Sequence, residues 1–417
     1  MPVGWSLIRA KYLLTKLDRA FRAEDIPLIC TNKGKVIERG ETNCGLVSSD
    51  EMNYQGVHPG DLLIHGMDTW HGAIAMSDLG GKCTTVVHVC DSEQDKRFLC
   101  YYYQALAYQN VYKLISNGIR QNTSDFRSFS KFGEIPTFVP PLREQQSIAD
   151  YLDERCAAID EVRHTIEDEI EALQRLRMAT IYKAVTKGLD SCERMKDSGV
   201  GWIGSIPERW TLRRWKYMLT ERKEKNDPVK LTQILSLSAE RGVTLYDESK
   251  RKGGNKAKED LSAYRIARKG DIVLNCMNIV SGSVALSEYD GCVSPVYFPY
   301  YPSNEHDDVR YYSYILQTTA FQRSLVGLGH GILMHESSTG KLNTVRTRIS
   351  PYMFGQLLLP CVASDEQQHI ADYLDERCAA IDSVIDTRTR QLQRLDDYRR
   401  AFIFAYVTGK KEVPSHE

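Results

Sequence analysis

The stretches EQQSIADYLDERCAAID (residues 144–160) and EQQHIADYLDERCAAID (residues 366–382) are identical except at one position. They start 222 residues apart, and the sequence between them shows little similarity to the sequence before the first copy. Internal repeats are sought first because they decide the architecture of a chain. A repeated helical stretch with divergent sequence between its copies predicts a frame that holds two interchangeable domains.

Two further blocks recur in the same order along the chain. PVGWSLIRAKYLLT from Pro2 matches PERWTLRRWKYMLT from Pro207, and GDLLIHGMDTWHGAIAMS from Gly60 matches GDIVLNCMNIVSGSVALS from Gly270. The offset between copies grows along the chain, so the second copy carries extra residues, which surface loops tolerate at little entropic cost. The sequence therefore predicts two copies of one domain, each followed by a helix.

The helical blocks repeat apolar residues every seven positions between charged residues, which is typical of long helices with a narrow apolar seam. Neither seam can be buried alone, so we expect the two helices to pack on each other, in an antiparallel arrangement. The residues predicted to pack the helices together or to contact partners are Ile148, Leu152, Ile159, Val162, Ile166, Leu173, Ile370, Leu374, Ile381, Val384, Leu395 and Phe402.

The sequence outside these helices predicts α+β domains. GDLLIHG, TTVVHVC, GDIVLN and VSPVYFPYY are short, rich in β-branched or aromatic residues and bounded by turns, as strands are. KRFLCYYYQALAYQNVYKLIS and DVRYYSYILQTTAFQRSLV look like amphipathic helices. The expected organisation is a first globular domain at 1–140, a long helix at 141–190, a linker and the start of the second repeat at 191–212, a second globular domain at 213–361, a second long helix at 362–410 and a tail at 411–417.

Composition is that of a globular protein in a reducing compartment. The 417 residues are 42% hydrophobic, and no apolar run is long enough to cross a membrane. The 11 cysteines form no C-x-x-C pair, and the N-terminus lacks a signal-peptide pattern. We therefore expect a cytoplasmic protein without disulfides, a metal site or a bound cofactor.

Catalytic motifs are missing from the sequence. VPPL at 139–142 lacks the polar and aromatic residues of an amino-methyltransferase loop, and STGKLN around Lys341 lacks most of a P-loop. No G-x-S-x-G, H-E-x-x-H or Cys/His cluster occurs. Two copies of a domain without a catalytic signature favour binding over catalysis.

Nucleic acid is the ligand that the charge distribution and polar loops suggest. Net charge is −1, but Lys and Arg outnumber Asp and Glu in 213–360, whereas they do not in 16–140. Arg can contact guanine, and Asn or Gln adenine, through paired hydrogen bonds. The loop GIRQNTSDFRSFSK, its counterpart in the second domain, the SKRKGGNKAK run and the divergent positions of the Gly60 block supply the candidates. The candidate DNA-binding residues are His65, Trp70, His71, Arg120, Gln121, Asn122, Arg127, Lys131, Lys252, Lys256, Asn275, Asn278, His335, Lys341, Asn343 and Arg346. For the loop residues, plain solvation of a polar loop is the competing interpretation. For the divergent positions of the Gly60 block and its counterpart, neutral drift is the competing interpretation.

Essentially the full length of the chain resembles the specificity subunits of type I restriction–modification systems. The matching pieces are IPERW followed by KY, GDIVLN, the GIRQN loop, PPLREQQSIADYLDERCAAID and DEQQHIADYLDERCAAID. The abrupt N-terminus, which begins inside the first repeated block, departs from the family and leaves the start of the chain in question.

The resemblance implies two target recognition domains, each recognising one half of a bipartite double-stranded DNA site. It also implies that an antiparallel helix pair sets the half-site separation and docks two methyltransferase subunits. Those subunits would bind S-adenosylmethionine and methylate adenine, and ATP-dependent nuclease subunits could join. This chain itself would be non-catalytic. The alternatives are a self-contained DNA methyltransferase or nuclease with two recognition domains, and a coiled-coil scaffold for protein partners.

Overall fold

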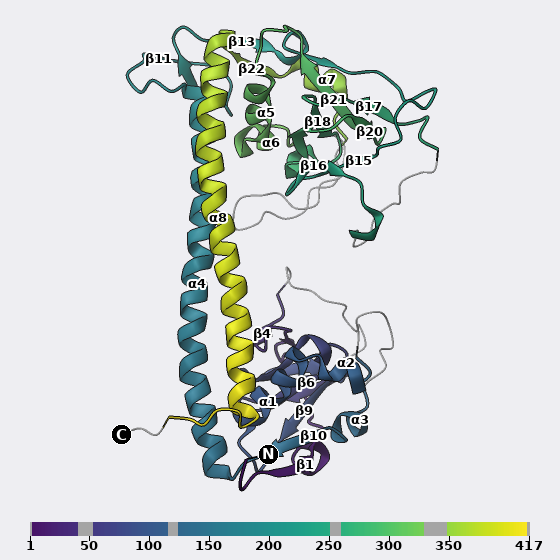
Figure 1. Cartoon of the computed structure of the whole chain (residues 1–417), viewed down its shortest axis with the longest axis vertical. Coiled ribbons are helices and arrows are strands. Elements are labelled where there is room, and N and C mark those ends of the chain that lie inside the picture. Colours follow the sequence, from purple (N-terminus) through teal and green to yellow (C-terminus); the bar gives the residue numbers. More distant parts are fainter. Residues whose placement is uncertain (1, 41–52, 116–123, 251–259, 329–347, 415–417) are drawn as a thin grey trace. The chain divides into compact units, whose positions relative to one another are not determined.

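The protein forms two compact units in a computed structural model that describes residues 2–40, 53–115, 124–250, 260–328 and 348–414. Unit 1 comprises Met1–Glu167 and Arg390–Glu417, and unit 2 comprises Asp168–Thr389. Each unit therefore contains one globular domain and parts of two long helices (Figure 1).

The long helices are α4 (Leu142–Lys187, 46 residues) and α8 (Ser364–Val407, 44 residues). Helix α4 begins directly after Pro140 and Pro141, where a chain cannot continue an earlier helix but can start one. Acidic residues lie in the first turn of both helices, Glu144 in α4 and Asp365 and Glu366 in α8. Their charge interacts favourably with the unpaired N–H groups at a helix start.

Helices α4 and α8 lie side by side and run antiparallel within each unit (Figure 1). In unit 1, Asp160 pairs with Arg399 at 3.6 Å, and Arg163 pairs with Asp396 at 3.2 Å. In unit 2, Glu169 pairs with Arg388 and Arg177 with Asp382, both at 2.9 Å. The partner's number falls along α8 as the residue number rises along α4, which is the register of an antiparallel pair.

Burial along the predicted apolar seam of the helices is uneven. Ile148, Leu152, Ile370 and Leu374 are buried at the helix starts. The other seam residues are half-buried: Ile159, Ile166, Leu173, Ile381, Leu395 and Phe402. Val162 and Val384 are 51% and 44% exposed, so they do not pack between the helices. Ion pairs therefore join the helices alongside these half-buried apolar side chains.

The globular domain of unit 1 is built on a four-stranded antiparallel sheet of order β2-β9-β6-β7. Helix α1 packs against β6 and β7 (Figure 1). Three two-stranded ladders complete the domain: β1-β10, β3-β4 and β5-β8. The strands are β1 (Ser6–Arg9), β2 (Thr15–Leu17), β3 (Leu28–Cys30), β4 (Val36–Glu38), β5 (Tyr54–Val57), β6 (Leu62–His65), β7 (Ile74–Met76), β8 (Gly81–Thr84), β9 (Val87–Asp91) and β10 (Pro136–Val139), and the helices are η1 (Ala10–Tyr12), η4 (Thr69–His71), α1 (Lys96–Tyr108), α2 (Val111–Ile115) and α3 (Phe129–Gly133).

The globular domain of unit 2 repeats this topology strand for strand. Its four-stranded sheet has the order β14-β21-β18-β19, and the ladders β13-β22, β15-β16 and β17-β20 match those of unit 1. The strands are β13 (Thr211–Arg214), β14 (Leu219–Glu221), β15 (Leu235–Ser238), β16 (Gly242–Leu245), β17 (Arg265–Ala267), β18 (Ile272–Asn275), β19 (Val284–Leu286), β20 (Gly291–Val293), β21 (Tyr297–Pro302) and β22 (Leu358–Cys361), and the helices are η5 (Trp215–Tyr217), η6 (Glu248–Lys250), η7 (Ile279–Ser281), α5 (Val309–Gln317), α6 (Thr319–Ser324) and α7 (Pro351–Gln356). The duplication predicted from three short blocks therefore extends over the whole domain.

The segment DSGVGWIGSIPERW (residues 197–210), which lies in the range 191–212 expected to be a linker and the start of the second repeat, is an ordered part of unit 2. Strands β11 (Met195–Asp197) and β12 (Ser205–Pro207) pair across it. Ile203 and Ile206 are buried in the core of the unit, and the Trp202 ring meets Phe321 edge to face at 5.3 Å. Glycines and serines here form turns that return apolar side chains to the core, so composition alone misidentified the segment.

In unit 1, the polar residues at the start of α4 form hydrogen bonds with the globular domain. The Trp5 indole N–H donates to Glu144 at 3.0 Å. The buried Gln145 side chain accepts from the Asp95 N–H at 3.0 Å and donates to the Pro140 carbonyl at 2.8 Å. Since Asp95 is the N-cap of α1, this amide ties the start of α1 to the start of α4.

Arg97 and Tyr101 of α1 complete the contact with α4. The Arg97 guanidinium lies 2.8 Å from both Asp150 and Asp153, and the Tyr101 hydroxyl donates to Asp153 at 2.7 Å. We call the following residues the docking cluster of unit 1: Trp5, Arg97, Tyr101, Glu144, Gln145, Asp150 and Asp153.

Unit 2 has the same docking cluster, formed by Trp210, Arg310, Tyr314, Glu366, Gln367, Asp372 and Asp375. Trp210 donates to Glu366 at 3.1 Å, and Gln367 accepts from the N–H of Asp308, the N-cap of α5, at 3.1 Å. Hydrogen bonds that Arg310 donates to carboxylates, Asp308 first, raise the pKa of its guanidinium above the ordinary value. The two helix starts therefore agree in sequence because each holds its own domain in the same way, a role that the sequence did not reveal.

We predict that Gln145→Ala and Gln367→Ala each destabilise the protein by about 1–3 kcal/mol, because each leaves buried backbone groups without partners. The free energy of unfolding of the full chain, measured by urea denaturation, checks this. Gln146→Ala and Gln368→Ala are the matched controls, since these neighbours are exposed. Equal effects at the buried and exposed glutamines would contradict the role assigned to the docking cluster.

Candidate nucleic-acid interface

The turn between β6 and β7 carries three of the candidate DNA-binding residues of unit 1. His65 ends β6, and its Nδ1 accepts from the Asp68 N–H at 3.0 Å. Helix η4 then presents Trp70 and His71 and is followed by Gly72, whose φ of +80° favours glycine. Since its ring is engaged in closing this turn, His65 has a structural role there, and His71 is the more exposed of the two histidines.

Unit 2 forms the same turn with different side chains. Asn275 occupies the position of His65, and its Oδ1 accepts from the Met277 N–H at 3.0 Å. It is 7% exposed, so this geometry supports a role in the turn over contact with bases. Asn278 is exposed at the start of η7, whereas Val280, which matches Trp70, is buried. The divergence at His65 and Asn275 therefore replaces one turn-closing side chain with another.

In unit 1, the segment that follows the GIRQN stretch forms backbone hydrogen bonds with the turn between β6 and β7. The corresponding segment of unit 2 bonds in the same way to the turn between β18 and β19. In unit 1, the Phe126 N–H donates to the Gly66 carbonyl at 3.0 Å and the Ser124 N–H to the Met67 carbonyl at 2.8 Å. A Cβ on Gly66 would lie 2.7 Å from the Phe126 carbonyl oxygen, so this approach requires glycine. In unit 2, the Ile349 N–H donates to the Cys276 carbonyl at 3.1 Å. The fold thus brings the flank of the loop and the β6–β7 turn together.

His88 secures the approach of Phe126, and the sequence did not single it out. Its Nε2 lies 2.6 Å from the Phe126 carbonyl oxygen, so the neutral ring donates its proton there. Burial lowers the pKa of His88, and burial also lowers the pKa of His65. No signal in the sequence indicates this role, because His88 lies in the strand-like stretch TTVVHVC among core residues. Its partner Phe126 is 38 positions away in the chain.

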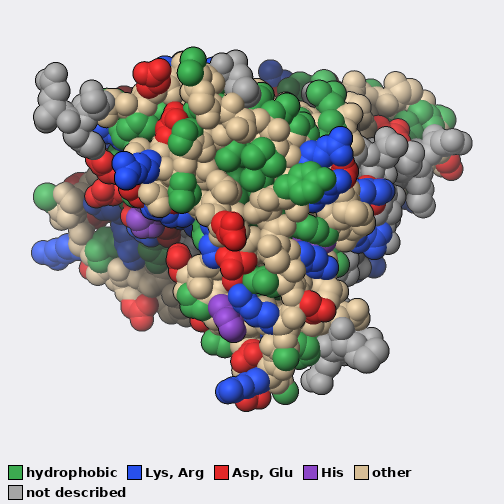
Figure 2. Space-filling view, turned by 90° about the horizontal axis from the view of Figure 1, so that it is seen from below, with side chains coloured by type: hydrophobic (Ala, Val, Ile, Leu, Met, Phe, Trp, Pro, Cys, Tyr) green, Lys and Arg blue, Asp and Glu red, His purple; other side chains and the backbone are tan. Residues whose placement is uncertain are grey.

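Two further candidates lie beside this contact. Arg127 is exposed directly after Phe126, whereas Lys131 forms an ion pair with Asp125. Lys and Arg side chains are interspersed with Asp, Glu and hydrophobic side chains on the face shown in Figure 2. The contacts of Arg127 and Lys131 with DNA stay predictions.

The remaining candidates lie outside the described residues: Arg120, Gln121, Asn122, Lys252, Lys256, His335, Lys341, Asn343 and Arg346. For these residues the sequence-based expectation stands without a structural description.

The part of the chain that the structure describes contains no group of three or more His, Cys, Asp or Glu side chains placed to hold a metal ion. None of its helices is both long and apolar enough to span a bilayer. Cys156 and Cys378, at matched positions in α4 and α8, are buried, and burial raises the pKa of both thiols. Both therefore pack as small apolar side chains.

Comparison with known proteins gives a full-length likeness in fold and a short one in sequence. No protein-family model matches the chain. The putative type I restriction enzyme MjaX specificity subunit of Methanocaldococcus jannaschii is 31% identical over 113 residues, which are 27% of this chain and 24% of that protein. The match thus spans about a quarter of the length of the curated relative.

Solved structures extend the likeness to the whole chain. A chain from a study of complex assembly and conformational transition of the type I R-M system superposes with a TM-score of 0.66 at 14% identity, covering 97% of this chain and 98% of that one. The HsdS subunit of Thermoanaerobacter tengcongensis gives a TM-score of 0.44 at 13% identity, over 99% and 98% of the two chains. The first match confirms the fold, α+β domains with two long helices. Together with the curated relative, it confirms the resemblance to type I specificity subunits.

We predict that acid weakens unit 1 through His88. Because its folded pKa lies below the ordinary histidine value of about 6.5, the folded state stays neutral while the unfolded state takes up a proton. Stability is therefore full above about pH 7 and falls as the pH drops through 6 towards 5. Thermal unfolding of the full chain across this range, followed by circular dichroism, measures the slope.

His88→Gln keeps an N–H for the Phe126 carbonyl but does not titrate, so its slope should be shallower than that of the natural chain. The exposed His306 supplies the control, since His306→Gln should leave the slope unchanged. A His88→Gln slope as steep as that of the control would contradict this assignment.

Proposed function

We propose that this chain is the DNA-specificity subunit of a type I restriction–modification complex. Each globular domain recognises one half of a bipartite site in double-stranded DNA, and the helix pair sets the separation of the halves. The observation that carries this proposal is the duplicated domain. Topology and docking cluster are repeated in both units, while the side chains of the β6–β7 turn and its counterpart differ. Two domains with the same topology and the same attachment to the helices, but with different side chains on one turn, are suited to recognise different half-sites.

The same proposal assigns the chemistry to partner subunits. Two methyltransferase subunits dock on the helices and bind S-adenosylmethionine, and ATP-dependent nuclease subunits join them for restriction. Support comes from the exposed apolar side chains of the helices, Val162, Leu176 and Val384, which neither globular domain covers. This chain contributes recognition and no catalytic group.

We predict that replacing residues 16–140 with the corresponding residues of a relative changes one half of the recognised site and leaves the other half intact. Selection of duplexes from a random pool by the full chain at physiological salt, before and after the replacement, measures this. Specific binding should exceed non-specific binding by about 10³-fold or more. A change in both halves, or in neither, would contradict the assignment of one half-site to each domain, and an absence of sequence preference would favour the protein scaffold.

Incubating the purified chain with labelled S-adenosylmethionine and DNA separates the subunit from a self-contained enzyme. We expect no transfer of label until a methyltransferase subunit is added. Robust methylation by the chain alone would refute the non-catalytic role.

A further inference from the structure

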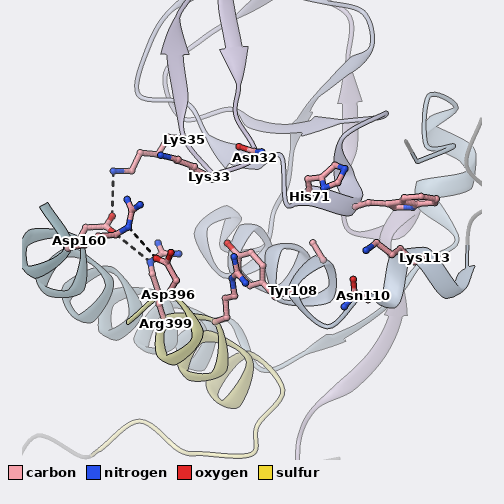
Figure 3. A pocket seen from close by; sticks show the side chains of 14 residues that line it. Asn32, Lys33, Lys35, His71, Tyr108, Asn110, Lys113, Asp160, Asp396 and Arg399 are labelled. Atoms are coloured by element: carbon pink, nitrogen blue, oxygen red, sulfur yellow. Dashed lines mark ion pairs between the residues drawn. The ribbon is translucent and has the colours of Figure 1, made fainter. Parts of the chain in front are cut away.

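Unit 1 contains a cavity of about 720 Å³ where its globular domain faces the long helices (Figure 3). Its walls come from the turn between β3 and β4, from η4, from the junction of α1 and α2, and from facing stretches of α4 and α8. Figure 3 shows the Lys35 side chain reaching towards Asp160, with Lys33 next to it and Asp396 and Arg399 near Asp160. His71, Asn110 and Lys113 lie along another side of the cavity.

Positive charge dominates this cavity, which is lined by six Lys or Arg residues and two Asp residues. Both acids are already paired with lining residues. Asp396 lies 3.2 Å from Arg163, and Asp160 lies 3.5 Å from Lys35 and 3.6 Å from Arg399. The acidic groups therefore offset only part of the charge that surrounds the cavity.

Three cations of the cavity wall remain weakly compensated. Lys33 and Lys113 are exposed and have no acidic partner among the residues that the structure describes. Arg400 lies 3.9 Å from the exposed Asp397, and its guanidinium stands 5.5 Å from the centre of the Tyr108 ring. Asn110, held at a φ of +57° between α1 and α2, adds an amide to the same wall. Cations and an amide around an open space are suited to an anion.

Unit 2 shows which of these residues the fold needs. Its helices repeat the Arg399–Asp160 pair as Arg177–Asp382, at 2.9 Å. In contrast, the turn between β15 and β16 contains Ala239, Glu240 and Arg241 where the turn of unit 1 has two lysines. The helix ion pair is thus part of the shared frame, whereas the lysines belong to unit 1 alone and require a separate explanation.

We propose that this cavity binds a phosphate group of the DNA backbone, gripped by Lys33 and Lys113 of the domain and by Arg400 of α8. The inference rests on the proposed function and adds a site to it. Phosphate contacts supply most of the sequence-independent affinity of DNA-binding proteins and fix their register on the duplex. The cavity adjoins η4, whose Trp70 and His71 also line it, so a phosphate held here lies next to the candidate recognition turn.

A free nucleotide offers the same phosphate chemistry, but the geometry favours a continuous backbone. Pockets for small ligands bury about 70–90% of the ligand surface. Here Lys33, Lys113 and Arg400 are all exposed, so they surround an open space instead of enclosing it. A phosphate bound to Arg400 and to the lysines would also connect the globular domain to α8, so DNA would hold domain and helix together.

The test uses the full chain and a short duplex carrying the site that the chain selects, with Lys33→Ala/Lys113→Ala as the variant. The control is Lys16→Ala/Lys411→Ala, which removes two exposed lysines outside the cavity. Because each phosphate contact contributes about 0.9 to the slope of log K against log salt, losing the one contact in this cavity should reduce the slope by roughly 1. Its affinity should fall equally for the selected duplex and an unrelated one, and by more than that of the control.

Three outcomes separate the possible failures. If the natural chain binds no duplex, the proposed function itself fails. If it binds duplex but the cavity variant loses no more affinity and slope than the control, the cavity inference alone is overturned. If equilibrium dialysis shows that a nucleoside monophosphate binds the natural chain but not the cavity variant, while duplex affinity matches the control, the cavity is a free-nucleotide site and the inference is likewise overturned. Circular dichroism of all variants establishes that they are folded.

Discussion

The buried amide of Gln145, repeated as Gln367, is the interaction on which the rest of the structure depends. Each amide bonds the backbone at the start of the first long domain helix and the backbone just before its own long helix. Buried backbone groups must be paired, so this arrangement tolerates little change in position. The surrounding Trp–Glu and Arg–Asp contacts then fix the orientation of the domain on the helix. One constraint, used twice, gives two equivalent positions for two domains.

This constraint explains which parts of the chain agree and which differ. The residues of the docking cluster have the same identity in both units, and matched residues donate and accept the same hydrogen bonds. Residues on the β6–β7 turn and its counterpart are free to change, provided that one side chain still closes the turn, as His65 and Asn275 both do. The lysines of the unit 1 cavity show the same freedom. The docking clusters, in contrast, keep the same residue types in both units.

Much of the fold could be predicted from the sequence, because long periodic helices and repeated blocks are local signals. The duplication, the antiparallel helix pair and the α+β character of the domains all follow from such signals. The role of the repeated helix start could not be predicted from the sequence. Arg97 and Asp153 are 56 positions apart, and no local pattern indicates that they form a pair. The Gly- and Ser-rich segment before Trp210 misled for a similar reason: its apolar residues are buried only by tertiary contacts.

The candidate site could be predicted less well. Sequence pattern identified the β6–β7 turn as divergent but could not tell that His65 and Asn275 are used within it. It also missed His88 and the lysines of the cavity, because pairing with a distant carbonyl and convergence of charge from separate elements are properties of the folded chain. Spacing along a helix is visible in one sequence, whereas proximity across a domain is not.

We propose that the two docking clusters hold two equivalent and independent DNA-recognition domains. The most direct measurement is a binding selection with a chain in which a second copy of residues 220–361 replaces residues 15–139, so that Arg310 and Tyr314 occupy the places of Arg97 and Tyr101. We expect a selected site that contains the same half-site twice. A site that still contains the half-site of the removed domain, or only one half-site in a chain that is fully folded, would contradict it.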